Sequence, residues 1–219
     1  MKKLLLLLIV IIDSCSPSTM ITGSWKSPSF KTKNYKNILV AALTDHAVAK
    51  STVENDMTEM LAKQQIKASK SIELFPIKMS NSESDRESLM RKIQNKKIDA
   101  LLTISLLKKE TESHYLDNSA LYDPVSHYGY YNNFWEYYSF WYPITYNNDY
   151  YTETIYYIET NLYDAKTENL VWSIQSKTYD QLELPSFSKE FAKIIVDKLK
   201  KDGILKPEVH ASNSVWNQM

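Results

Sequence analysis

Residues 38–43 read Ile-Leu-Val-Ala-Ala-Leu, a continuous apolar run with polar residues on both sides. A short run without alternation is typical of a strand that is buried on both faces of its sheet. Such a strand needs covering elements above and below it. The segments that follow indicate what those elements are.

The next 65 residues predict two helices and two further strands. Val53, Met57, Met60 and Leu61 recur at helical spacing, which predicts a helix from about residue 49 to 65, and residues 66–74 then read as a second strand.

Ser84 and Glu87 have the spacing of a capping box ahead of an apolar face, so a second helix is expected to run to about Lys96. Residues 100–107 form a third apolar strand. Two helices between three such strands imply parallel pairing through right-handed crossovers.

The C-terminal third predicts a β-hairpin and a long helix. Residues 152–164 and 170–179 alternate in hydrophobicity around a turn at 164–169. An amphipathic helix begins near Pro185 and ends at Gly203, and residues 204–219 are predicted to be a tail. The fold class is therefore α/β, a single two-layer or three-layer domain over residues 38–203 with a mixed sheet of about five strands.

The N-terminus has the layout of a signal peptide. Lys2 and Lys3 precede nine aliphatic residues at positions 4–12, which rise only about 14 Å as a helix and do not span a bilayer. The chain has one cysteine, Cys15, so no disulfide partner explains it. Residues 1–14 are predicted to be cleaved, and residues 15–37 are predicted to form a lipidated tether.

Ile12, Ser14 and Cys15 resemble the lipobox of bacterial lipoproteins, with an aliphatic residue three before the cysteine and a small one just before it. The resemblance implies cleavage before Cys15 and acylation of its thiol and amino group. Two or more acyl chains suffice for stable anchoring. Ser16, in place of an aspartate, resembles the sorting preference for the outer membrane, which implies a domain facing the periplasm.

The order of elements resembles the α/β domain of envelope accessory lipoproteins: the TolB N-terminal domain, the penicillin-binding-protein activators and the curli secretion lipoprotein. Residues 23–26, Gly-Ser-Trp-Lys, and residues 159–165, Glu-Thr-Asn-Leu-Tyr-Asp-Ala, are also similar to segments of an uncharacterised family of bacterial envelope lipoproteins. These segments are family markers, and no catalytic residues come with them.

Residues 115–151 form a Tyr-rich insertion, the strongest compositional anomaly of the chain. Between residues 115 and 157 lie 13 of its 16 tyrosines, with two tryptophans and two phenylalanines. Such side chains suit a recognition surface for a protein, a glycan or lipid headgroups, or a satellite core that covers the sheet. The candidate surface residues are Tyr128, Tyr130, Tyr131, Phe134, Trp135, Tyr138, Trp141 and Tyr142.

Several functional classes find no support in the composition. Equal numbers of basic and acidic residues, 26 each, give no electrostatic reason to bind nucleic acid. Three glycines form no phosphate-binding loop, and the four histidines lack metal-ligand spacing, so no cofactor and no metal is expected. The sequence predicts a non-enzymatic lipoprotein, held on the membrane through Cys15, that acts through contacts with envelope proteins; the alternative is a glycan-binding lipoprotein that uses residues 115–151.

Overall fold

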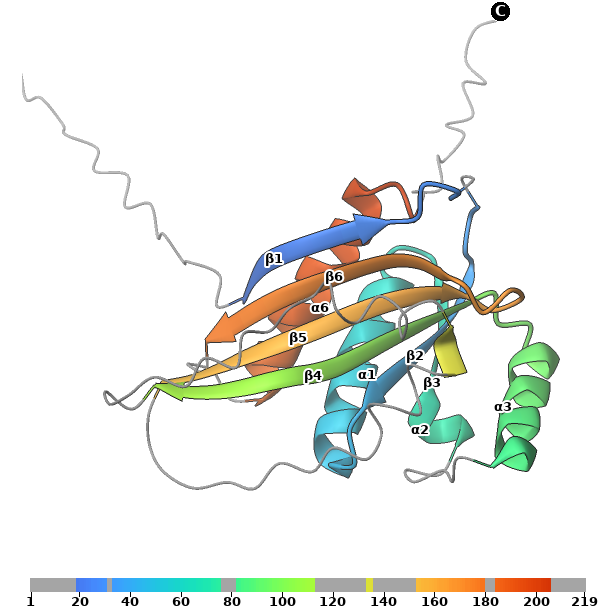
Figure 1. Cartoon of the computed structure of the whole chain (residues 1–219), viewed down its shortest axis with the longest axis horizontal. Helices are drawn as coiled ribbons and strands as arrows, with labels where there is room; N and C mark the ends of the chain where they lie inside the picture. Colours follow the sequence, from blue (N-terminus) through green and yellow to red (C-terminus); the bar gives the residue numbers. More distant parts are fainter. Residues whose placement is uncertain are drawn as a thin grey trace, which may run out of the picture.

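The computed structural model describes residues 19–30, 33–75, 82–112, 133–135, 153–179 and 184–205 (Figure 1). These residues form one six-stranded sheet with the strand order β1-β6-β5-β4-β2-β3. The elements are β1 (Thr19–Lys26), β2 (Asn37–Leu43), α1 (Ala47–Ala62), β3 (Lys67–Lys70), α2 (Ser71–Leu74), α3 (Glu83–Asn95), β4 (Ala100–Glu112), β5 (Glu153–Asp164), β6 (Leu170–Tyr179) and α6 (Leu184–Lys201).

The sheet is mixed, with a parallel half and an antiparallel half. Strand β2 pairs in parallel with both β3 and β4, as the alternation of strands and helices predicts. Strand β5 pairs antiparallel with β4 and with β6, which confirms the hairpin. The α/β prediction is confirmed, with six strands in place of about five.

The sixth strand, β1, lies where the sequence predicts a tether. The tether prediction is wrong for residues 19–26, which pair antiparallel with β6. A β-bulge between Ile21 and Gly23 breaks the alternation that would have identified a strand. The hydroxyls of Thr19 and Thr178 form a buried hydrogen bond of 2.9 Å, which fixes the start of β1 on the sheet.

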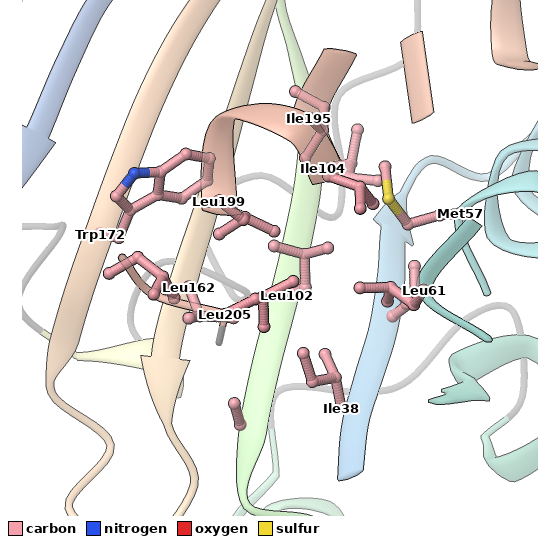
Figure 2. Packing of buried hydrophobic residues seen from close by; sticks show 14 of the residues in the cluster. Ile38, Met57, Leu61, Leu102, Ile104, Leu162, Trp172, Ile195, Leu199 and Leu205 are labelled. Carbon is pink, nitrogen blue, oxygen red and sulfur yellow. The ribbon is translucent and has the colours of Figure 1, made fainter. Parts of the chain in front are cut away.

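The sheet carries a separate apolar core on each face. Helices α1 and α6 cover one face, where Trp172 and Leu162 gather with Leu199 of α6 and with Leu205 (Figure 2). On the other face, Leu89 and Ile93 of α3 belong to a second cluster with alternate residues of β2. The domain therefore has three layers where β2 and β4 cross its middle.

The C-terminal end of α6 holds β1 and β6 together. Trp172 Nε1 donates to Asp202 Oδ2 at 2.7 Å, and Lys26 Nζ donates to the Asp202 carbonyl at 2.9 Å. Gly203 adopts a φ of 72°, which only glycine adopts without strain, and ends the helix as predicted. The buried residue Ile204 then donates its N–H to the Leu199 carbonyl at 2.9 Å.

Three local predictions need correction. The tail prediction over residues 204–219 is wrong for Ile204 and Leu205, which lie in the core, while residues 206–219 lie outside the described part of the chain. The predicted strand over 66–74 is a strand only at 67–70, because residues 71–74 turn into α2. Ser82, rather than Ser84, caps α3 through a 3.3 Å hydrogen bond from the Asp85 N–H.

Asp164 closes the turn between β5 and β6. Its Oδ1 accepts from the N–H groups of Lys166 and Thr167 at 3.0 and 3.1 Å, and its Oδ2 accepts from Lys33 Nζ at 2.5 Å and from the Tyr35 hydroxyl at 3.2 Å. Burial raises the pKa of the Asp164 carboxyl, but the bonds from Lys33 and the two backbone N–H groups outweigh it, and the net pKa lies below the usual value.

We predict that Asp164→Asn lowers the free energy of unfolding by about 1–3 kcal/mol at neutral pH, because five donors, the four above and the Thr167 hydroxyl at 3.4 Å, lose a charged acceptor. A carboxyl with a depressed folded pKa stabilises above its ordinary pKa of about 3.9 and loses that effect as pH falls through the folded value. The difference between the two proteins, measured by urea unfolding, should therefore shrink below about pH 4. The exposed Asp197→Asn serves as the control, with little difference at any pH. A constant gap for Asp164→Asn across pH would contradict the assignment.

Candidate functional site

The structure tests only part of the predicted recognition surface. Phe134 and Trp135 lie among the described residues. The other predicted residues, Cys15, Tyr128, Tyr130, Tyr131, Tyr138, Trp141 and Tyr142, lie outside them.

Phe134 is a core residue. Its side chain is 1% exposed and packs edge-on against Tyr163, with ring centroids 5.7 Å apart. The prediction that Phe134 presents its ring to a partner is wrong, and at this position the satellite-core alternative holds. Trp135 is partly buried against the same cluster.

The short segment 133–135 is held at the turn end of the β5–β6 hairpin. Phe134 N–H donates to the Glu168 carbonyl at 3.2 Å, and Asn133 Nδ2 donates to Glu168 Oε2 at 3.3 Å. Arg86 of α3 reaches the same carboxylate oxygen at 3.4 Å. The described residues that flank the insertion, Glu112 of β4 and Glu153 of β5, lie at the opposite end of the sheet.

The sheet face that carries Phe134 changes from apolar to polar along its strands. Beside the apolar cluster lies a buried polar patch of β4, β5 and β6. Glu159 is 1% exposed, and its carboxylate accepts from Asn161 Nδ2 at 2.8 Å and Gln175 Nε2 at 3.3 Å. Thr103 and Ser105 are equally inaccessible.

Tyr163 borders the polar patch. Burial raises the pKa of its hydroxyl far above the usual range, and the nearby charge of Glu159 raises it further. The phenol therefore stays protonated at physiological pH. Its ring packs against that of Phe134.

A buried ion pair fills the carboxyl end of β2, where α/β folds commonly bind ligands. Lys50 and Glu54 of α1 lie 3.1 Å apart with side chains 3% and 0% exposed. Lys50 Nζ also donates to the Ala42 carbonyl at 2.6 Å. Burial lowers the pKa of Lys50, and the Glu54 charge opposes that shift.

Three further groups of the chain donate hydrogen bonds to the Glu54 carboxylate. It accepts from the Ala42 N–H at 3.0 Å, the Ser71 hydroxyl at 2.6 Å and the Ile72 N–H at 2.9 Å. The pair thus joins β2, α1 and α2. It is a structural brace that sequence spacing did not reveal, since i, i+4 Lys–Glu pairs are ordinarily exposed. Asp45, which also follows β2, lies next to His46, the N-cap residue of α1.

The exposed surface of the described residues offers few large apolar side chains. Met20 and Trp25 of β1 are 55% and 36% exposed, and Val48 is 73% exposed. Within the described ranges no group of three or more His, Cys, Asp or Glu could hold a metal ion. His114, His127 and His210 lie outside these ranges. Among the helices described, none is long and apolar enough to cross a membrane.

Comparison with known proteins identifies similar structures but no family. No family model matches the chain, and no curated protein sequence matches it. The PelC dodecamer from Paraburkholderia phytofirmans aligns with 11% identity and a TM-score of 0.45, covering 83% of this chain and 96% of that one. Lipoprotein GNA1162 from Neisseria meningitidis aligns with 12% identity and a TM-score of 0.39, covering 75% and 98%. At these values the function has to be inferred from the chain's own residues.

We predict that Glu54→Gln lowers the free energy of unfolding by roughly 3–5 kcal/mol, because it leaves the Lys50 charge buried without its partner. The double variant Lys50→Met/Glu54→Gln should lose less than the sum of the two single variants in urea unfolding. Glu59→Gln is the matched control: Glu59 pairs with Lys63 at 2.8 Å on the same helix, but both side chains are exposed, so little change is expected. Additive single effects would show that the pair does not act as a unit.

Proposed function

We propose that this protein is a bacterial envelope lipoprotein, anchored through lipid on Cys15 to the outer membrane and facing the periplasm. It acts without catalysis, as an accessory or assembly factor that binds another envelope protein. The N-terminal residues 1–15 support the anchor, and the exposed edge strand β1 supports protein binding.

Strand β1 ends the sheet order, so among the described residues it has a hydrogen-bonded neighbour on one side only. Unpaired edges invite a further strand, and proteins commonly protect them by making them short and charged. The opposite edge, β3, fits that protection: it has four residues and reads Lys-Ala-Ser-Lys. Strand β1 has eight residues and carries no charge before Lys26.

The partner that fits this edge is an extended peptide segment. Added strands gain affinity from main-chain hydrogen bonds and specificity from alternate side chains. Beyond the bulge, residues 23–26 are regularly paired on β6, and Trp25 lies there with an exposed ring. Tryptophan is among the residues most enriched at binding hot spots.

The glycan-binding alternative depends on exposed aromatic side chains of residues 115–151. Phe134 is withdrawn from that surface by burial, and Trp135 is partly withdrawn. No contact among the described residues favours a glycan over a protein as the partner. The crosslinking experiment below therefore also tests for bound polysaccharide.

We predict that the protein incorporates labelled palmitate and that Cys15→Ala abolishes the label and leaves the precursor uncleaved. Ser16→Ala should keep the label, because the thiol is unchanged. Ser16→Asp should keep it as well but move the protein from the outer-membrane to the inner-membrane fraction on a density gradient. Labelling of Cys15→Ala would refute the anchor, and an unmoved Ser16→Asp would refute the proposed sorting.

We predict that a photo-crosslinking residue at Trp25 captures specific envelope proteins in living cells, whereas the same residue at Lys67 of β3 does not. Trp25→Ala should weaken binding of the identified partner about thirtyfold or more, since truncating a hot-spot aromatic typically costs about 2 kcal/mol or more. Identical crosslinking profiles at residues 25 and 67 would contradict the proposal that the β1 edge binds the partner. If polysaccharide co-purifies instead, the glycan alternative takes its place.

A further inference from the structure

The start of β1 leaves very little chain between the lipid and the folded domain. If Cys15 is acylated as proposed above, only Ser16, Pro17 and Ser18 separate it from Thr19. Four residue steps span at most about 14 Å when fully extended. The domain is therefore held close to the bilayer surface. The 23-residue tether that the sequence predicts would have let it move away from that surface.

The first residues of β1 cannot unpair and lengthen this connection without losing buried contacts. Thr19 is 3% exposed, pairs with Thr178 of β6 and shares the hydroxyl hydrogen bond with it. Releasing the first residues of β1 would expose these buried hydroxyls and the adjoining core.

The tips of β4 and β5 extend beyond Thr19 in the same direction. Thr19 lies in register with Thr178, Tyr156 and Lys109, and the β4–β5 ladder continues three pairs further, to Glu112 opposite Glu153. Three pairs correspond to about 10 Å of strand. The overhang lies within the reach of the tether, so an inserted anchor lets the tip of the ladder contact the membrane surface. Figure 1 shows the end of β4 extending past the start of β1.

The side chains near this end suit a headgroup layer. One row crosses four strands through Met20, Lys177, Tyr157 and Lys108, with Met20 exposed. Tyrosine rings and lysine side chains are typical of the membrane–water interface, since each joins an apolar body to a polar end.

The three described lysines at this end each contact an aromatic ring or a carboxylate. Lys109 lies over the ring of Tyr156 and Lys177 over that of Tyr179, at 5.8 and 4.9 Å. Glu110 pairs with Lys108 and accepts from the Tyr157 hydroxyl. The chemistry therefore fits neutral as well as anionic lipid, with apolar and aromatic contact ahead of electrostatic attraction.

We infer that the end of the sheet formed by the start of β1, the end of β6 and the β4–β5 tips lies against the lipid headgroups. The strands stand end-on to the membrane. The turn end of the hairpin, Trp25 and the C-terminal end of α6 point away from it. This orientation rests on the proposed lipidation and leaves the regular part of the β1 edge open to a periplasmic partner.

The test uses the lipidated protein in phosphatidylcholine vesicles with a headgroup-attached spin-label quencher. Because Cys15 is the one native cysteine and its thiol is acylated, Met20→Cys and Trp25→Cys can each be labelled singly with an environment-sensitive fluorophore. These positions lie about 15 Å apart along β1. We expect at least about twofold stronger quenching at residue 20 than at residue 25, because residue 20 lies about 15 Å nearer the headgroups, with little dependence on salt, because the contact is mainly apolar.

Each other outcome has a definite meaning. Equal quenching at both positions would show β1 lying flat on the bilayer, and no quenching at either would show the domain standing off; both overturn the orientation. Inserting twenty Gly/Ser residues between Ser18 and Thr19 should reduce the signal at residue 20 to that at residue 25, and an unchanged signal would refute the role of the tether. Failure of the anchor itself is distinguishable, since mass spectrometry would then find Cys15 unmodified and the protein would not co-float with vesicles.

Discussion

The structure depends on the burial of β2. Every residue of this strand is buried, so the sheet needs cover on both faces at its centre. Helices α1 and α6 supply it on one side, and α3 with Phe134 supplies it on the other. The Lys50–Glu54 pair then fixes α1 against the end of β2, so the elements that cover the strand are also held at its carboxyl end.

Local patterns were sufficient for elements whose hydrophobic periodicity is unbroken. The apolar runs of β2 and β4, the β5–β6 hairpin and the amphipathic α6 all appear in the sequence because their periodicity reports burial directly. Strand β1 did not, because its bulge interrupts alternation and its pairing partner lies about 150 residues away. Phe134 and the Lys50–Glu54 pair were missed for the same reason: sequence gives residue type, whereas burial of an aromatic ring or an ion pair is decided by distant segments.

The face of the sheet opposite α1 and α6 divides its length among three environments. Its turn end is apolar and holds α3 and Phe134, its middle is a closed polar patch around Glu159, and its far end carries lysines and tyrosines. Lys108 and Lys177 flank Tyr157 there, whereas the same positions further along the strands are Ser105, Gln175 and Glu159. The residues that stabilise the fold and the residues proposed to contact the membrane surface thus lie at different positions along the strands.

The pairing of β1 with β6 also sets an order of events during biogenesis. Thr19 and Thr178 are 159 positions apart, so β1 has no place in the sheet until β6 is available to pair with it. The edge strand at the start of the described chain therefore depends on the last strand of the sheet to be synthesised.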